Sequence, residues 1–561
     1  MIFICAVAAL SNVSCSLEEQ VFTQTDESYI TDASMAEPLL LGVYRKLGTD
    51  GVYRLNLSFM FNSGTDESKA EGNHLDSFRS EQSNAFAASS QYVEQTWREL
   101  YSAVYDANYF LEMAHRKMET FAEEDQAKLA VYIAEAHALR GLLYFELVRW
   151  FGNVPLVIST EGAARTPDKY TQADPVDVYR QIEADLTAAL SLPYYDEDKV
   201  RKTNSFRISK GAVLGLLAKV YATWAGYPLY DESKWELAAE KAEELISMQK
   251  HELLPSYKTL WENAANNVWD PKESLLELSY WSPISTDASS GRVGNFNGVR
   301  GIQGALKKNA PGHNVGLYIN PTFFQNWKDY DRDQRFALTY ADYEYKIVDG
   351  KAAAVNYKTV GTRQISFLEA LEGTDPDWIP DWRNVYSYRI TFGKWDTEKY
   401  VKDENYQTVG NYTNINWYLL RYSDVLLLYA EALNEWKGEP TPEAYKAVNM
   451  VRRRAFGLDV STASDVADLP TGLLYEDFRQ AVMDERKWEL AGEGHRRQDL
   501  IRWGIYCKTV NDTYKALANW HYNAQQYFQA GIYTQEGKHE LLPIPQREID
   551  LCGFKQNQNW N

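Results

Sequence analysis

The sequence has few cysteines and a deficit of basic residues for its length. Only 4 of its 561 residues are cysteine, and they form no CxxC pair, so neither a zinc ribbon nor a thioredoxin-like redox motif is present. Its 58 Lys and Arg stand against 78 Asp and Glu, which gives a formal net charge of −20. A field of that sign repels phosphate backbones, so we expect no nucleic acid among the partners.

Motifs of the common enzyme classes are missing as well. No GxxxxGK[ST], GxGxxG, GxSxG or HExxH string occurs, so nucleotide binding, a serine elbow and a zincin site have no support. The segment from Asp329 to Asp333 imitates the start of an EF-hand loop, but Gln334 replaces the turn glycine. The 8 histidines are scattered along the chain. We therefore predict no metal and no cofactor, whereas the absence of these motifs does not by itself exclude an enzyme.

The first residues have the pattern of a bacterial lipoprotein signal. Met1 to Leu10 is an apolar run that is too short to span a bilayer but suits the core of a secretory signal peptide. It leads through small and polar residues to Cys15, where we predict lipidation; the alternative is an unmodified cysteine in a short tail. The acidic stretch Ser16 to Glu19 is similar to the signal that sends Bacteroidetes lipoproteins to the outer face of the outer membrane.

Helical periodicity dominates both ends of the body of the chain. Large apolar residues recur three and four positions apart through 91–150, and Gly152 and Pro155 end that pattern. Further amphipathic segments are predicted at 36–47, 176–192, 209–226, 234–249, 421–437, 442–456 and 476–491. Their pairing echoes tetratricopeptide repeats without a fixed period.

The middle of the chain has a different composition. Between 251 and 415 the sequence becomes richer in Gly, Asn, Pro, Ser and aromatic residues. Within it, the segment from Ser274 to Tyr280 predicts a short strand. We predict a mainly α fold: a tetratricopeptide-like helix-pair superhelix with an inserted loop-rich subdomain that contains short strands. The predicted divisions are a signal peptide (1–15), a tether (16–35), an N-terminal helical part (36–250), the loop-rich insertion (251–415) and a C-terminal helical part (416–561).

The C-terminal third carries the most specific pattern. Its main segments run from Arg421 to Asn434, Ala447 to Arg454, Asp484 to Trp503 and Leu541 to Pro545. With the helices of 97–108 and 135–155, these segments resemble the SusD/RagB family over essentially the whole chain. The resemblance implies a cell-surface glycan-binding lipoprotein, not an enzyme, that acts with a SusC-like TonB-dependent transporter in nutrient uptake.

The charged residues of that pattern have a structural interpretation. They lie three or four positions apart, so opposite charges can meet along helices and between packed helices. They are Glu485, Arg486, Glu489, Glu493, Arg496, Asp499 and Arg502. We expect them to be scaffold, and we expect Trp97, Trp150, Trp327 and Trp503 to be buried. Because fold and ligand site are separate questions, this pattern does not identify the ligand.

A sugar-binding surface needs flat aromatic rings and polar side chains that reach hydroxyl groups. The loop-rich segments 62–79 and 280–318 contain this mixture, and the resemblance implies a glycan site built from roughly these two regions. The candidate ligand-binding residues are Asp66, Asn73, His74, Arg79, Trp281, Phe296, Arg300 and Tyr318. The Trp281 ring follows the predicted strand directly, so it either stacks on a sugar or plugs the junction with the loop. Loop packing remains an alternative for each candidate.

Three other functions stay open at this stage. The ligand could be a peptide or glycopeptide, or the chain could be a helical scaffold with protein partners only. It could also be a surface glycosidase, which needs two carboxyl groups on either side of the sugar bond. The 78 acidic residues offer too many pairs for the sequence to select one.

Overall fold

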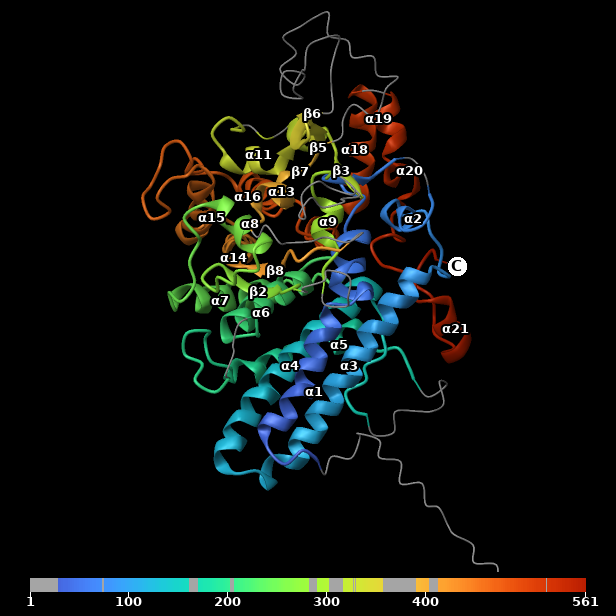
Figure 1. Cartoon of the computed structure of the whole chain (residues 1–561), viewed down its shortest axis with the longest axis vertical. Coiled ribbons are helices and arrows are strands. Elements are labelled where there is room, and N and C mark those ends of the chain that lie inside the picture. The colour runs from blue at the N-terminus through green and yellow to red at the C-terminus, as the bar shows by residue number, and fades with distance from the viewer. Residues whose placement is uncertain are drawn as a thin grey trace, which may run out of the picture.

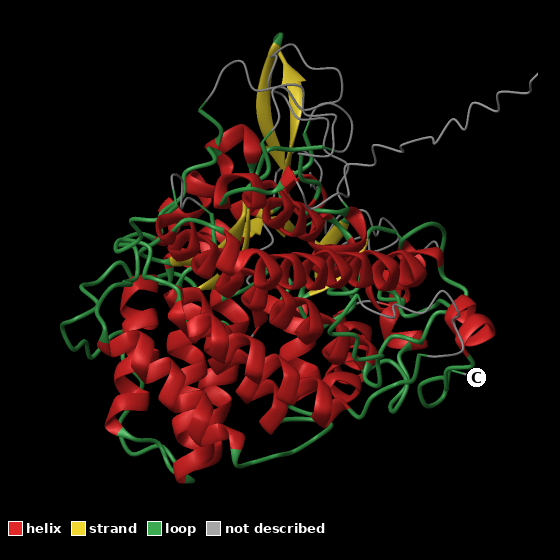
Figure 2. Ribbon diagram, turned by 90° about the horizontal axis from the view of Figure 1, so that it is seen from below, coloured by secondary structure: helices red, strands yellow, loops and turns green. Residues whose placement is uncertain are grey.

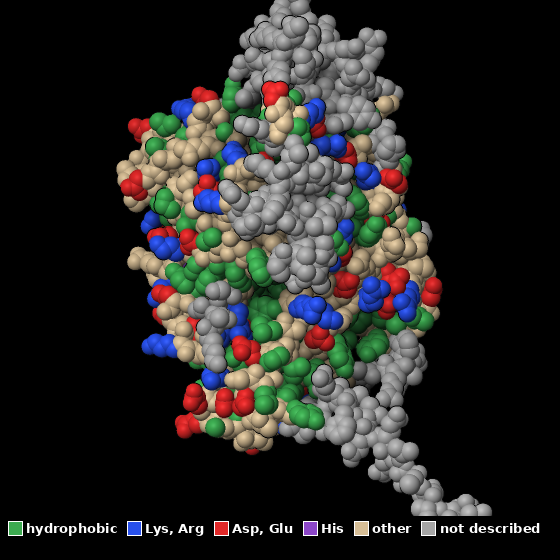
Figure 3. Space-filling view, in the orientation of Figure 1, with side chains coloured by type: hydrophobic (Ala, Val, Ile, Leu, Met, Phe, Trp, Pro, Cys, Tyr) green, Lys and Arg blue, Asp and Glu red, His purple; other side chains and the backbone are tan. Residues whose placement is uncertain are grey.

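The structure is a computed structural model that describes residues 29–72, 75–160, 170–201, 206–281, 290–301, 316–325, 327, 329–356, 390–402, 412–520 and 522–560. It is mainly helical with short two-stranded sheets, which confirms the predicted fold class (Figures 1 and 2). None of its described helices is both long enough and apolar enough to cross a membrane. Acidic, basic and hydrophobic side chains are interspersed over the face shown in Figure 3.

The N-terminal half consists of long helices that lie side by side in Figure 1. They are α1 (Ala33–Leu47), α3 (Gln91–Lys117), α4 (Glu123–Phe151), α5 (Pro175–Ala188), α6 (Lys210–Ala225) and α7 (Lys234–Ser247). Local signals set their ends: the side chains of Asp32, Ser90 and Asp174 cap α1, α3 and α5. Helix α4 ends at Gly152, whose φ of 69° is strained for any other residue. The helices predicted from periodicity in this half are confirmed.

Shorter elements connect these long helices. They are η2 (Asp50–Arg54), η3 (Asn56–Met60), β1 (Ser68–Ala70), α2 (Arg79–Gln82), η4 (Met118–Thr120) and η6 (Ala189–Ser191).

The C-terminal part is again helical. Its elements are α14 (Tyr422–Lys437), α15 (Pro442–Ala455), α16 (Tyr475–Glu489), α17 (Arg496–Arg502), α18 (Tyr506–Trp520), α19 (Tyr522–Tyr527), α20 (Ala530–Tyr533) and α21 (Gln546–Cys552). Gly438 in the left-handed region ends α14, and Thr441 with Pro442 starts α15 three residues later. The three predicted helices of this part are confirmed as α14, α15 and α16.

The middle segment mixes short helices with strands. Its helices are α8 (Tyr257–Ala265), α9 (Val293–Asn297), α10 (Thr322–Gln325), α11 (Gln334–Thr339), η8 (Gly393–Trp395) and α13 (Thr397–Tyr400). Its strands are β2 (Ser274–Leu278), β3 (Leu317–Ile319), β4 (Tyr340–Ala341), β5 (Tyr343–Val348), β6 (Lys351–Asn356) and β7 (Thr391–Phe392). Strand β8 (Trp417–Arg421) follows. The pairs β1–β3, β2–β8, β4–β7 and β5–β6 are antiparallel, and the β5–β6 hairpin projects from the body (Figure 2).

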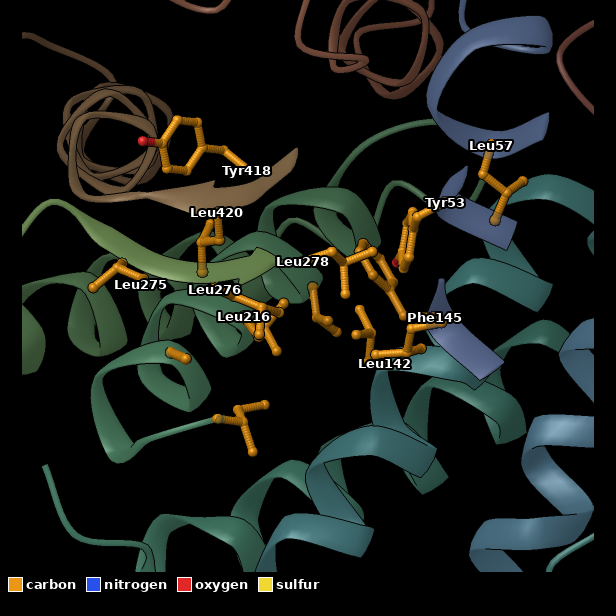
Figure 4. Packing of buried hydrophobic residues seen from close by; sticks show 14 of the residues in the cluster. Tyr53, Leu57, Leu142, Phe145, Leu216, Leu275, Leu276, Leu278, Tyr418 and Leu420 are labelled. Atoms are coloured by element: carbon orange, nitrogen blue, oxygen red, sulfur yellow. The ribbon is translucent and has the colours of Figure 1, made fainter. Parts of the chain in front are cut away.

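Strand β2 ties the middle segment to the helical body. All five of its residues are buried, and its partner β8 runs directly into α14. Figure 4 shows Leu276 of β2 close to Leu216 of α6, with Leu142 and Phe145 of α4 in the same cluster. Gly215 permits this approach, because a Cβ there would lie 2.8 Å from the Leu420 side chain. One hydrophobic core therefore includes residues of the N-terminal, middle and C-terminal parts.

The cysteines divide into two groups. Cys507 is buried and Cys552 is half-buried, and neither forms a disulfide with another described residue. Cys5 and Cys15 lie outside the described residues, so the predicted lipidation at Cys15 stays a prediction.

Candidate functional site

Three of the predicted site residues converge on Glu71. Arg300 donates from Nη2 to Glu71 Oε1 at 2.8 Å, and Arg79 Nη2 lies 3.4 Å from Oε2. Arg79 also donates from Nε to the backbone carbonyl of Glu71 at 3.0 Å, and the Tyr318 hydroxyl donates to Oε1 at 3.5 Å. The side chains of Glu71, Arg79 and Arg300 are 26%, 25% and 34% exposed. We call Glu71, Arg79, Arg300 and Tyr318 the Glu71 cluster.

Backbone pairing positions this cluster. Strand β1 pairs with β3 so that Lys69 lies opposite Tyr318, and the Glu71 N–H donates to the Gly316 carbonyl at 3.2 Å. The Arg300 carbonyl accepts a 2.9 Å hydrogen bond from the Tyr345 N–H in β5. Side chains that are more than 200 positions apart in the sequence therefore meet at one place, near α2, α9 and β3 in Figure 1.

Three phenylalanine rings pack against one another beside the Glu71 cluster. The ring centroids of Phe59, Phe78 and Phe296 are 5.2 to 5.9 Å apart, in tilted or edge-to-face pairs. The Arg79 guanidinium lies 5.5 Å from the Phe78 ring. Phe296 is only 4% exposed. The structure therefore places Phe296 as packing beside the cluster, which fits the loop-packing alternative, and Tyr318 is equally buried at 5% exposed.

A second group of paired charges is centred on Asp50. Asp50 accepts from Arg54 Nε at 2.6 Å and from Arg292 Nη1 at 2.9 Å. Both guanidiniums lie near the Tyr412 ring, at 5.9 and 5.5 Å from its centroid, and Arg292 lies 5.6 Å from the Phe296 ring. We call Asp50, Arg54, Arg292 and Tyr412 the Arg292 cluster. Through Phe296 it connects to the Glu71 cluster.

Trp281 lies where β2 leaves the body, and its side chain is 61% exposed. Its neighbour Tyr280 is 3% exposed, and its ring packs on Gly291, where a Cβ would come within 2.8 Å. Tyr280 therefore fills the junction, and the interpretation of Trp281 as a plug is wrong. Tyr280 is next to Trp281, and Gly291 is next to Arg292. The packing of Tyr280 on Gly291 therefore connects the Trp281 segment to the Arg292 cluster.

Asp66 has a different environment from the rest of the predicted set. It is 7% exposed and accepts from Arg496 Nε and Nη2, both at 2.9 Å, with Lys487 Nζ 3.1 Å away. Burial alone would raise the pKa of Asp66, but Arg496 and Lys487 lower it well below its usual value. Asp66 therefore belongs to the interior of the structure, which fits the packing alternative that was open for this residue. Asn73 and His74 lie outside the described residues.

The charged residues of the C-terminal pattern form an interior network. Glu489 contacts Arg421, Arg335 and Arg454 at 2.9, 3.1 and 2.5 Å, and all four side chains are at most 1% exposed. Burial opposes ionisation of Glu489, but the three arginines lower its pKa to about 2. Arg421 also pairs with Glu493 at 2.8 Å. The predicted scaffold role of these charges is confirmed.

The large rings that were predicted to be buried are buried. Trp97, Trp150, Trp327 and Trp503 are 4%, 1%, 2% and 8% exposed. Trp327 donates from Nε1 to Asp333 at 2.9 Å, and Asp333 pairs with Arg335 at 2.7 Å. The EF-hand-like segment therefore supplies an ion-pair partner to the interior network through Asp333.

Sequence reasoning missed the residue on which the site is centred. Glu71 lies inside the segment 62–79 that was singled out, but a single acidic residue among 78 carries no local signal. Arg54, Arg292 and Tyr412 come from three distant segments, and only the fold brings them together.

Comparison with known proteins identifies the family. Residues 322–560 match the model of the SusD family, and residues 26–222 match a model described as starch-binding associating with outer membrane. A SusD homolog from Bacteroides thetaiotaomicron VPI-5482 is 45% identical, with a TM-score of 0.87 over 95% of this chain and 98% of that chain. The chain belongs to the SusD family.

More distant relatives extend this result. SusD-like protein P25 of Formosa agariphila is 26% identical over 94% of this chain and 91% of its own length. A laminarin binding SusD-like protein shares the fold, with 23% identity and a TM-score of 0.65 over 94% of this chain and 99% of its own. Trp281, Arg292, Arg300 and Tyr318 all lie between the two segments that match SusD family models. The two family-model matches therefore do not include these four residues of the proposed site, which come from the middle of the chain.

Proposed function

We propose that this SusD family protein binds oligosaccharides at the cell surface, on the face that includes the Glu71 cluster, the Arg292 cluster and Trp281. The observation that carries the proposal is the combination of an exposed ring, Trp281, with half-buried guanidiniums that present fixed donors. Flat rings suit the apolar faces of sugars, and charged donors orient hydroxyl groups. A SusD-like neighbour described as laminarin binding supports a glycan as ligand.

The face needs no catalytic group for this role. Glu71 is held between two arginines, an arrangement that positions donors and acceptors and asks for no proton transfer. We therefore propose capture without hydrolysis.

We also propose the setting in which capture occurs. Acylation at Cys15 would anchor the mature chain to the extracellular face of the outer membrane, since two or more acyl chains suffice for stable anchoring. A SusC-like TonB-dependent transporter would receive the glycan. Mass spectrometry of the native N-terminus and copurification of a transporter from membranes test these two points. An unmodified Cys15, or protection from added protease in intact cells, would contradict them.

The ligand is tested with the chain from residue 16 onward against a panel of neutral and acidic oligosaccharides and peptides. Calorimetry measures binding, and chromatography of the recovered sugars measures cleavage. We expect one glycan class to bind and to be recovered intact. Shortened products would show a glycosidase, whereas binding of peptides alone would show the peptide-binding alternative.

A matched pair of variants ties the binding to the proposed face. Arg300→Ala removes a guanidinium from the Glu71 cluster, and Arg180→Ala removes one from an exposed pair with Asp177 on α5. We expect weaker glycan binding in the first variant only. Equal binding by both variants would move the site to another face.

A further inference from the structure

A groove lies on another part of the molecule, away from the face of the proposed function. It is a groove of about 370 Å³ between α3, the segment 155–159 and α21, and it shares no residue with the Glu71 or Arg292 clusters. Its volume falls within the range of about 300–1,000 Å³ that is typical of small-molecule sites.

One wall of the groove is a row of aromatic rings on α3. Trp97, Tyr101 and Tyr105 follow each other at intervals of four residues, so they lie on one face of the helix. The Trp97 and Tyr101 ring centroids are 5.0 Å apart, and Tyr105 is 52% exposed. Tyr170 adds a fourth ring to the lining, and Phe554 lies 6.4 Å from Trp97.

Charges of both signs border these rings. Glu94 and Arg98 come from α3, and Arg547 and Glu548 come from α21, so the charges of the lining cancel. Arg547 Nη1 lies 3.1 Å from Glu94 Oε1, with side chains 60% and 33% exposed. Partial burial raises the pKa of Glu548, Arg547 opposes the rise and Glu94 adds to it.

Helix α21 borders the groove and touches the core only through the partly buried side chains of Ile549 and Cys552. None of its residues from Gln546 to Cys552 is buried, and Leu551 is 51% exposed. Its attachment to the helical body includes the exposed Arg547–Glu94 pair and a 3.0 Å hydrogen bond from the Gln546 N–H to the Ala88 carbonyl. An exposed pair of this kind contributes little to stability.

We infer that this groove is a second saccharide site that takes a short, neutral oligosaccharide. Rings beside charged side chains of both signs suit a ligand with apolar faces and a hydroxylated edge. An acyl chain would place hydrocarbon against four charged side chains and displace the water that hydrates them, which is unfavourable. A strongly charged ligand would meet like charge on either wall. The inference rests on the lining of the groove and does not depend on the Glu71 cluster.

The test separates the two sites by working in a Trp281→Ala/Arg300→Ala background, where both the ring and a guanidinium of the proposed face are removed. The probes are maltohexaose, laminarihexaose, cellohexaose, mannohexaose and xylohexaose, titrated by calorimetry, with dodecanoate as the acyl-chain probe. We expect residual binding of at least one hexasaccharide. Tyr105→Ala and Arg98→Ala, added to this background, should each weaken it about fivefold or more. The matched control is Tyr230→Ala, which removes a ring that is 58% exposed and lies outside the groove.

Each outcome has a separate meaning for the two sites. If the Trp281→Ala/Arg300→Ala background removes all hexasaccharide binding, the groove site is overturned and the proposed function stands. If Tyr105→Ala weakens binding and Arg300→Ala does not, the groove site stands and the proposed face is overturned. Residual binding that both groove variants leave unchanged, binding of dodecanoate alone, or no binding of any hexasaccharide overturns the groove site. Because Tyr105 is half-exposed, its removal leaves the fold intact, which circular dichroism checks.

Discussion

Two groups of arginines and glutamates in this protein differ mainly in what surrounds them. Around Glu489, the side chains of Arg335, Arg421 and Arg454 are at most 1% exposed, whereas around Glu71 the guanidiniums of Arg79 and Arg300 are 25% and 34% exposed. The same pairing chemistry therefore holds helices together in one region and leaves donors accessible to solvent in the other. The family pattern lies in the interior group, and that is why it identifies the fold and says little about the ligand.

The largest expected effect comes from breaking the interior group. Glu489→Ala leaves three buried arginines without a shared carboxylate, so it should lower the free energy of unfolding by about 3–5 kcal/mol. Chemical denaturation measures the loss. The control Glu344→Ala removes the partner of Lys346, whose side chain is 56% exposed, and should cost about 1 kcal/mol or less. Similar losses in both variants would show that burial does not distinguish the two kinds of pair.

A buried glutamate outside both groups gives the next largest effect, which depends on pH. Burial raises the pKa of Glu277 from 4.5 to about 7, although Ser274 and Asn416 donate hydrogen bonds to it. Its contribution to stability is therefore complete below about pH 4.5 and is lost as the pH rises towards 7. At about 1.4 kcal/mol per pKa unit, the loss is about 3 kcal/mol. Denaturation at pH 5 and pH 8.5 should show a smaller decline for Glu277→Gln than for the unmodified chain. Equal declines would mean that Glu277 is ionised throughout.

On the exposed face, the largest effect should come from Trp281. Because its ring is 61% exposed, Trp281→Ala should leave the thermal midpoint nearly unchanged. The same change should weaken glycan binding about tenfold or more, since a few aromatic contacts usually dominate such interfaces. Calorimetry with the glycan selected from the panel measures the affinity. Undiminished affinity in a folded variant would remove Trp281 from the site.

The smallest effect should come from single guanidiniums of the Glu71 cluster. Arg300→Ala should weaken glycan binding about fivefold. It should change stability by about 1 kcal/mol or less, because its pair with Glu71 is partly exposed. A large loss of stability would mean that the Glu71 cluster belongs with the interior group after all.

The sequence was informative where local physics decides the structure. The period of apolar residues predicted α3 and α4, and caps such as Asp174 explain why the helices begin where they do. Trp97 was correctly placed in the core because it falls on the apolar face of its helix. Long-range contacts were not predictable in this way. Asp66 looked like a loop carboxylate, and only the fold brings Arg496 to it from 430 positions away.

The site was predicted in part for the same reason. The two loop segments 62–79 and 280–318 do meet, as the contacts of Arg79 and Arg300 with Glu71 show. Which aromatic ring faces outward was not predictable from the chain alone, because Phe296 and Trp281 lie in the same loop-rich stretch, and one is 4% and the other 61% exposed.

Hydrogen–deuterium exchange with and without the selected glycan tests the central claim most directly, because it compares the two regions in one experiment. Binding at the proposed face should protect the peptides that contain Glu71, Arg79 and Arg300, and it should leave the already buried segment around Glu489 unchanged. Protection of residues 94–105 in addition would report the groove. If saturating glycan protects neither the segment around Glu71 nor the segment around Arg300, the glycan binds elsewhere and the account of the face is wrong.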